Sequence, residues 1–526
     1  MEEQCELAII GAGYAAISAF NAAAKYLPLG STVVIVDRGT KWGGQFTTQY
    51  DYVRLHQPYQ QFTAGEREWA IAKVKPPTYL ATKMEILSHF DDIANACIEE
   101  KNLNVIYLWN YQYNRDYKIN SDGKVEFVVH HVRPVDEDDK NKNNNYENIK
   151  ILPVRVVADR MINGSGFDVQ RKQRFQFEKH IRSRIHSLRP ADVQTAKFNS
   201  LMKYSKDFDK PIYIIGSGKT AMDTMLALKR LGNKVASRIR CIAGRGTYFI
   251  NRDRNDNNKW FLEMMDRFDG TNSIQIAKEM EQVGFLHTAI PDARSCSLGV
   301  CSSWEVESIR ETLHSAPNKI IKGYLKDIVV SHNNKLCLKL LALNTHMETQ
   351  KEIEDGTFIV NCTDNLGFNN PTVFDPIVSN DGKVLSPQGA LGFSGQSADL
   401  LTHCWYQEIE SFDSVWRNIP RLEPRIGDKL GTTIGAMYLV AVITQAVAGI
   451  LPKEQIAKNK QINSSTPQEP VPREISSKIP KIVAKFQEMF KGRYDDDVAF
   501  HDDFEFMDEV KKIRTKLETL PAISRL

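Results

Sequence analysis

The sequence predicts an α/β protein built from two Rossmann-like domains and a helical C-terminal extension. An apolar run, a glycine-rich turn and a helix candidate follow one another from Leu7, and the same pattern begins again at Pro211. The length of 526 residues is enough for two or three domains with a large core. The expected segments are a first domain from 1–170 and 341–410, an inserted domain from 171–340, an apolar helical extension from 411–458, and a linker with a polar helical tail from 459–526.

The composition is that of a soluble globular protein, with 42% apolar and 25% charged residues. Lys and Arg together number 68 against 65 Asp and Glu, which gives no basic footprint for nucleic-acid binding. His and Cys show no zinc-ligand spacing, so no metal site is expected. The acidic start lacks an apolar signal stretch, and eight Cys in this length do not indicate a disulfide framework. We therefore expect a cytoplasmic protein.

The first glycine pattern, Gly11–Ala16, follows the apolar run Leu7–Ile10. Gly11 permits a tight turn, Gly13 lets the backbone approach a pyrophosphate, and Ala16 lets the helix pack close to the sheet. The pyrophosphate would lie at the helix N terminus, where free N–H groups and the helix dipole favour negative charge. This pattern therefore predicts a dinucleotide site.

The second expected strand, 32–36, ends at Asp37, which Arg38 follows. An acidic residue at this place accepts hydrogen bonds from ribose hydroxyls. Asp37 and Arg38 are therefore expected to contact the dinucleotide, and an acid-ended site at the N terminus suits FAD.

The second glycine pattern follows the apolar run Pro211–Ile215, and a helix candidate runs on from it to about residue 231. Its expected nucleotide contacts are Gly216, Gly218, Lys219, Thr220 and Ala221. The next strand, 238–243, leads to Arg245 and not to an acid. An Arg there pairs with a 2′-phosphate that an acid would repel, so we favour NADPH over NADH. A solvated loop charge is the alternative interpretation of Arg245.

In the order of its motifs, the chain from about 5 to 410 resembles the flavin-containing monooxygenases and their class B relatives. Residues 42–46 are similar to the family's Gly-Gly-x-Trp segment beside FAD, with the Trp before the glycines, and residues 53–58 resemble its Leu-His-x-Pro segment near the flavin. The resemblance implies that FAD contacts come from Gly43, Gly44, Gln45, Arg54 and His56. It also makes His56, Gln57 and Gln45 candidates for lining the flavin, where they would hydrogen-bond and exclude water. A structural histidine is the alternative for His56.

The family's linker motif is matched only in part, because His186 and Pro190 fit while His180 and Arg182 replace its Phe and Gly. This departure bears on the monooxygenase interpretation more than on the flavoprotein interpretation.

Two later segments also carry the resemblance. The strand candidate 358–362 with Thr363 and Asp364 resembles the strand ending in Ala-Thr-Gly that returns the chain to the FAD domain. The resemblance therefore implies that Thr363 and Asp364 contact the FAD. Residues 392–400 resemble the last FAD segment, so Gly395 is expected at a helix N terminus that faces the flavin.

The resemblance implies an FAD- and NADPH-dependent monooxygenase. It would transfer one oxygen atom, from dioxygen by way of a C4a-(hydro)peroxyflavin, to a nitrogen, sulfur or carbonyl carbon of a small molecule. Two alternatives stay open. One is an FAD reductase or dehydrogenase that does not activate oxygen, including a dithiol form that uses Cys296 and Cys301. The other is a non-catalytic binding protein on a flavoprotein fold.

Residues 432–451 are uncharged and mostly apolar, and twenty such residues are long enough to span a bilayer. Their small residues also suit close helix packing. We favour a buried helix, at a substrate tunnel or a homodimer face, with a membrane anchor as the alternative.

Overall fold

The structure of the protein is a computed structural model that describes residues 1–64, 67–132, 152–165, 175, 177–204, 206–254, 260, 263–264, 266–269, 271–343, 347–363, 377–387 and 395–408. The polar tract 136–148, Asp364, the apolar stretch 432–451 and the polar tail lie outside the described residues. The predictions made for them therefore stay predictions.

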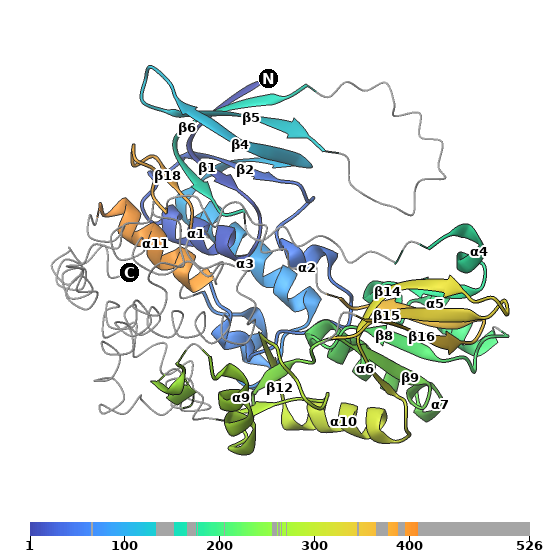
Figure 1. The fold of residues 1–526 in the computed structure, drawn as a ribbon. Helices are drawn as coiled ribbons and strands as arrows, with labels where there is room; N and C mark the ends of the chain where they lie inside the picture. The colour runs from blue at the N-terminus through green and yellow to red at the C-terminus, as the bar shows by residue number, and fades with distance from the viewer. Residues whose placement is uncertain are drawn as a thin grey trace.

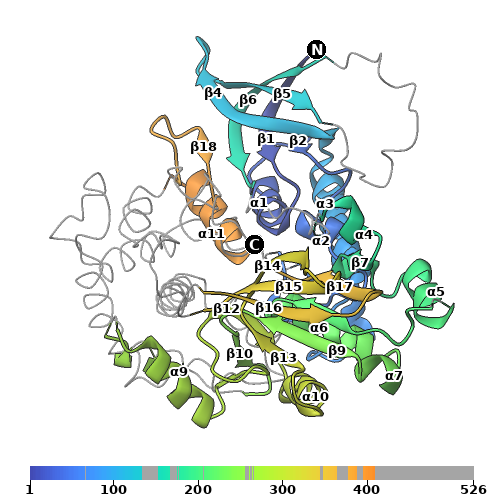
Figure 2. The same ribbon diagram turned by 45° about the vertical axis from the view of Figure 1, so that its right-hand side comes forward.

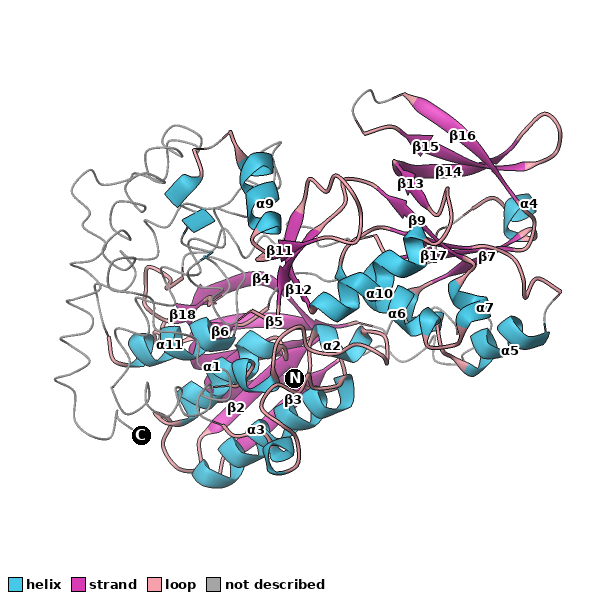
Figure 3. Cartoon of the chain, turned by 90° about the horizontal axis from the view of Figure 1, so that it is seen from below, coloured by secondary structure: helices cyan, strands magenta, loops and turns pink. Residues whose placement is uncertain are grey.

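The first domain is a mixed sheet in the order β3-β2-β1-β6-β5-β4, with β18 paired to β6. Its strands are β1 (Glu2–Ile10), β2 (Thr32–Asp37), β3 (Asn104–Trp109), β4 (Tyr111–Ile119), β5 (Val125–His131), β6 (Val154–Asn163) and β18 (Val384–Leu385). Its helices are α1 (Tyr14–Ala24), α2 (Gln45–Thr48), α3 (Lys83–Lys101) and α11 (Gly395–Tyr406). Helix α1 is rich in alanine and buried on nearly every side, because it packs between the sheet, α3 and α11 (Figure 3).

The second domain is a parallel sheet in the order β13-β9-β8-β17-β7, with two three-stranded sheets beside it. The parallel strands are β7 (Ile185–Leu188), β8 (Ile212–Ile215), β9 (Ile239–Ala243), β13 (Ile320–Lys322) and β17 (Thr357–Asn361). The smaller sheets are formed by β10 (Tyr248–Asn251), β11 (Leu286–His287), β12 (Cys296–Cys301), β14 (Tyr324–Val330), β15 (Leu336–Leu341) and β16 (Glu348–Ile353). The helices are α4 (Lys179–Arg182), α5 (Ala196–Tyr204), α6 (Lys219–Lys229), α7 (Asn233–Ala236), α9 (Ser273–Gln282) and α10 (Ser303–His314).

The two-domain α/β fold is confirmed, but one boundary differs from the expectation. Strand β17 pairs with β8 and β7 of the second sheet, so the second domain extends past residue 340 to Asn361. The chain returns to the first sheet only at β18 and α11. The prediction that the strand at 358–362 returns the chain to the first domain is therefore wrong. Its apolar sequence indicates a buried parallel strand but does not say which sheet it joins.

The two domains lie one above the other, with α2 and the chain that follows it between them (Figures 1 and 2). Among the described residues, no helix is both long enough and apolar enough to cross a membrane.

Candidate functional site

The first glycine turn lies at the junction of β1 and α1, as predicted. Gly11 has φ +95°, and a Cβ there would lie 3.0 Å from the carbonyl carbon and oxygen of Gly164, so only glycine fits. Its N–H donates to the carbonyl of Val36 at 2.7 Å, which binds the turn to β2. Gly13 is the N-cap of α1 and has no capping side chain. The first N–H groups of α1 are therefore free of a side-chain cap, as an anion site requires.

Gly43 and Gly44, which precede α2, pack directly on this first glycine turn. The N–H of Gly43 donates to the carbonyl of Ala12 at 2.8 Å. Gly44 has φ +49°, and a Cβ there would lie 2.6 Å from the Cα of Gly13. Bare backbone from two segments thus surrounds the N terminus of α1, and this cradle fits the diphosphate of a dinucleotide. Gln45, the first residue of α2, is exposed at its edge.

Asp37 ends β2 beside the same turn. Its carboxylate accepts the N–H of Ala12 at 2.8 Å and the N–H of Gly39 at 2.6 Å. Burial raises the pKa of Asp37, while these two backbone hydrogen bonds oppose the rise. A carboxylate has about four lone-pair sites, so two bonds leave capacity for ribose hydroxyls. The neighbouring Arg38 is exposed.

A short motif, which the sequence did not lead us to predict, lies beside each glycine turn. After β6, the side-chain oxygen of Asn163 accepts the N–H of Ser165 at 3.3 Å and also its hydroxyl. After β17, the side-chain oxygen of Asn361 accepts the N–H of Thr363 at 3.1 Å and its hydroxyl at 2.6 Å. The signal was present in the sequence, because Ile-Asn-Gly-Ser (162–165) and Val-Asn-Cys-Thr (360–363) are alike.

This repeat corrects the predicted place of Thr363. A Cβ on Gly216 would lie 2.8 Å from the carbonyl oxygen of Cys362, so Thr363 lies at the second glycine turn. The expectation that Thr363 contacts the first dinucleotide is therefore not supported by its position. At the first turn, residues 163–165 occupy the corresponding place.

The second glycine turn also lies at a strand–helix junction, between β8 and α6. The N–H of Gly216, whose φ is +110°, donates to the carbonyl of Ile242 at 2.9 Å. Gly218 is the N-cap of α6, again without a capping side chain. Lys219, Thr220 and Ala221 form the first turn of the helix, and Ala221 is fully buried. Both glycine patterns thus present an uncapped helix N terminus at the carboxyl end of a strand that pairs with parallel neighbours.

Arg245 lies just after β9, half-buried, and other cations lie near it. The N–H of Arg294 donates to the carbonyl of Arg245 at 2.8 Å. Lys322 ends β13 opposite Ala243, and burial lowers the pKa of its ammonium while Arg294 lowers it further. Asp292 is the acidic group beside Lys322. The sequence pattern found only Arg245, because the other two cations reach this edge from distant segments.

The chain after α2 connects the two turns. The hydroxyl of Tyr50 donates to Asp223 of α6 at 2.8 Å, and the hydroxyl of Tyr52 lies 3.0 Å from that of Thr224. Gly44 touches the first turn, and Tyr50 follows it six positions further along the chain, a reach of at most about 22 Å. The two helix N termini therefore flank one short segment of chain.

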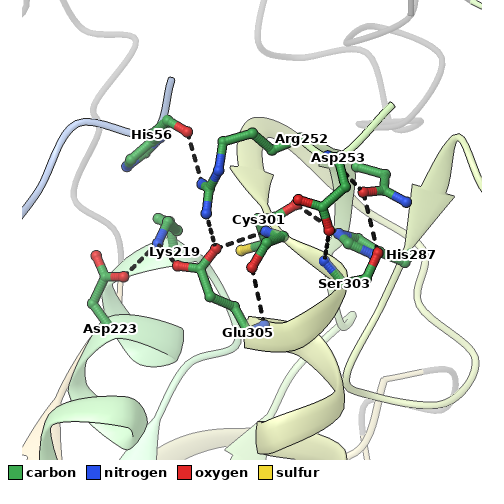
Figure 4. A network of polar contacts seen from close by, with 11 residues as sticks. His56, Lys219, Asp223, Arg252, Asp253, His287, Cys301, Ser303 and Glu305 are labelled. Atoms are coloured by element: carbon green, nitrogen blue, oxygen red, sulfur yellow. Dashed lines mark hydrogen bonds and ion pairs between the residues drawn. The ribbon is translucent and has the colours of Figure 1, made fainter. Parts of the chain in front are cut away.

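That segment ends at His56, where a buried ionic network begins (Figure 4). Arg252 donates to the backbone carbonyl of His56 at 2.8 Å and to the carboxylate of Glu305 at 2.5 Å. Glu305 lies 3.3 Å from the ammonium of Lys219, which also pairs with Asp223. All four charged side chains are at most 16% exposed.

The network sets the protonation of its members. Burial alone would raise the pKa of Glu305, but Lys219 and Arg252 lower it to about 2. Burial and the positive charges of Lys219 and Arg252 together lower the pKa of His56 to about 4. His56 is therefore a neutral imidazole at physiological pH and is suited to hydrogen bonding, not to carrying charge.

The other predicted site residues are placed as follows. Arg54 is exposed and donates to the carbonyl of Leu80 at 3.0 Å, which engages it within its own domain. Gln57 is half-buried beside His56. Gly395 is the first residue of α11, which packs along α1. His186 of the linker motif lies at the N-terminal end of β7, opposite Phe358, and so at the end of the sheet away from the glycine turn.

Comparison with other proteins gives matches in structure but not in sequence. No protein-family model and no curated protein sequence matches the chain. Among solved structures, an ornithine hydroxylase from Pseudomonas aeruginosa has a TM-score of 0.45 at 11% identity, over 78% of this chain and all of that one. An FAD-bound cadaverine monooxygenase from Erwinia amylovora has a TM-score of 0.44 at 11% identity, over 78% and 95%. A cyclohexanone monooxygenase has a TM-score of 0.45 at 11% identity, over 84% and 93%. These matches are among class B flavin monooxygenases, the group that the sequence resembles.

Proposed function

We propose that the protein is an oxidoreductase that binds FAD at the first glycine turn and NADPH at the second. The observation that carries the proposal is the pair of uncapped helix N termini that flank the segment from Gly44 to His56. FAD bound there would accept a hydride from the nicotinamide and pass electrons on. The diphosphate of FAD would be held by the backbone of residues 11–13 and 43–44, and its ribose by Asp37.

The choice of NADPH over NADH has its own support. No acid ends β9, Arg245 follows it, and the backbones of Arg294 and Lys322 pair with residues 245 and 243. Among the described residues, Asp292 is the acid that acts on Lys322, and the three cations favour an anionic group there.

We further propose that the electrons go to dioxygen and that one oxygen atom enters a small-molecule nitrogen, sulfur or carbonyl group. The support is the half-buried, neutral imidazole of His56, which can hydrogen-bond to a bound group without adding charge. Gln57 and Gln45 are the further residues proposed to line this site.

The dithiol form of the reductase alternative is not supported. Cys296 and Cys301 lie at opposite ends of the extended strand β12, a separation of about 16 Å at 3.3 Å per residue. A disulfide needs Cα atoms within about 7 Å of each other. Burial also raises the pKa of the Cys301 thiol to about 12, so it is not the reactive thiolate of such an enzyme.

The experiment is to purify the protein, release and identify its bound cofactor, and follow NADPH, dioxygen and hydrogen peroxide together. Released FAD supports the first site. Oxidation of NADPH with less than stoichiometric peroxide, in the presence of amine, thioether or ketone candidates, supports oxygen transfer. Stoichiometric peroxide with every candidate indicates a reductase or oxidase, and a colourless protein that does not oxidise NADPH refutes the proposal.

A further inference from the structure

The segment that carries His56 belongs to the first domain but is hydrogen-bonded to the second domain. Its side chains Tyr50 and Tyr52 bond to α6, and its backbone carbonyl at His56 accepts from Arg252, which follows β10. Within the first domain, Leu55 bonds to Ala81 and Tyr59 bonds to Tyr79 through backbone N–H groups. At His56 itself, the backbone carbonyl accepts a hydrogen bond from Arg252 of the second domain.

Arg252 is well suited to this task. Its guanidinium has two separate nitrogens in use, one on the His56 carbonyl and one on Glu305. Glu305 is fixed in turn, because its carboxylate accepts the N–H of Ser302 at 2.6 Å in the capping box of α10 and lies 3.3 Å from Lys219. A planar fork between two fixed acceptors holds its position better than a flexible ammonium does.

The other end of the network lies at the second glycine turn. Lys219 is the first residue of α6, and its ammonium is held by Asp223 and Glu305. The chain of contacts therefore runs from the start of the second dinucleotide site to the backbone of His56 (Figure 4).

We propose that Arg252 is a positioning residue, which sets the place of His56 relative to the second dinucleotide site by joining the His56 carbonyl to Glu305. The expected effect of Arg252 on flavin reduction rests on the proposed function. Its expected effect on the position of residues 53–59 does not. Arg252 acts through His56 and is not assigned a contact with substrate or cofactor.

The test compares Arg252→Gln and Arg252→Lys with wild type in the full-length, purified holoprotein. The first measurement is hydrogen–deuterium exchange of peptides that cover residues 53–59, and this measurement needs no turnover. We expect exchange to be at least about threefold faster in Arg252→Gln, with a smaller increase in Arg252→Lys, because an ammonium keeps the charge but loses the fork. The matched control is Arg184→Gln, which removes a forked arginine bound to Asp355 and Asn334 at the far end of β7.

The second measurement is the rate of flavin reduction by NADPH against the dissociation constant of NADPH. A displaced segment lowers the rate, by about 10- to 100-fold, and leaves the dissociation constant within about threefold. Unchanged exchange at 53–59 in both Arg252 variants overturns the inference, as does a loss in NADPH binding with an unchanged reduction rate. If Arg252→Gln does not fold, Arg252→Lys decides alone. If exchange at residues 53–59 is faster but NADPH does not reduce the flavin even in the wild-type protein, Arg252 positions the segment and the proposed function is refuted.

Discussion

At the scale of single residues, Arg245 carries the expected preference for NADPH. A charge-assisted hydrogen bond contributes about 1.5–3 kcal/mol, which is about 10- to 100-fold in affinity. We therefore expect Arg245→Ala to raise the dissociation constant of NADPH by that factor and to change that of NADH by less than about threefold. Titration of the two dinucleotides against intrinsic fluorescence measures both.

The matched control for this prediction is Arg240→Ala. Arg240 lies on the same strand toward its other end, where its guanidinium donates to the carbonyls of Ser237 and Ile239 at 2.9 and 3.0 Å. Its loss should leave both constants unchanged. An equal loss of NADH and NADPH binding in Arg245→Ala would show that Arg245 does not contact the 2′-phosphate.

The buried His89 of α3 leads us to predict how stability depends on pH. Its ring stacks on Trp69 at 3.9 Å between centroids, and among the described residues neither ring nitrogen has a hydrogen-bond partner. Burial lowers its pKa from 6.5 to about 3. Below pH 6.5 the unfolded chain binds a proton at His89 that the folded chain does not bind. The free energy of unfolding is therefore unaffected by His89 above pH 6.5 and decreases as the pH drops toward 3.

We expect His89→Phe, which keeps the stacked ring, to reduce this loss by about 1.4 kcal/mol per pH unit. Denaturant unfolding at several values between pH 6.5 and 4 measures it. His56 and His287, both with pKa values of about 4, keep titrating in the variant. A variant as acid-labile as wild type would contradict the explanation.

At the scale of elements, the contact between Gly44 and the first glycine turn is central to the proposed FAD site. Gly44→Ala places a Cβ 2.6 Å from the Cα of Gly13, and backbone cannot yield cheaply there. We expect FAD affinity to fall at least about tenfold, measured by release of flavin fluorescence on dilution. The control is Gly30→Ala, since Gly30 also has a positive φ of +80° but has open space around it. That variant should lose about 1 kcal/mol of stability and retain FAD.

Strand β12 gives a prediction for the cysteines. All eight cysteines are buried, and none of them forms a disulfide. We expect the same number of thiols to react with an aromatic disulfide reagent before and after NADPH is added. We also expect NADPH to reduce the flavin of the Cys301→Ser variant at the wild-type rate. Two additional thiols after NADPH would restore the dithiol alternative.

The same scale shows what the sequence predicts and where it stops. Strand-turn-helix order locates both glycine turns, because Gly11 and Gly216 satisfy local backbone requirements that any chain must meet. The place of β17 depends on which sheet has a free edge beside β8, and local sequence does not contain that information. Arg252 and Glu305 were missed for the same reason, since 53 residues separate them and only the fold brings them together.

At the scale of the whole molecule, one short segment, residues 44–56, contacts both domains. Tyr50 is buried and Tyr52 is half-buried, and their rings stack with centroids 4.4 Å apart. The Tyr50 hydroxyl bonds to α6, and the Tyr52 hydroxyl bonds to the carbonyl of Pro190. Such packing would fix the two proposed dinucleotide sites relative to each other, as direct hydride transfer requires, because the reacting atoms must come within about 3–3.5 Å.

The most direct measurement is anaerobic mixing of the purified holoprotein with NADPH deuterated at the transferred position of the nicotinamide. If the two helix N termini hold their dinucleotides against one another, the visible absorbance of bound FAD bleaches in one saturable phase, and deuterium slows that phase. Bound FAD that NADPH leaves oxidised, or a protein that retains no flavin, would contradict the account.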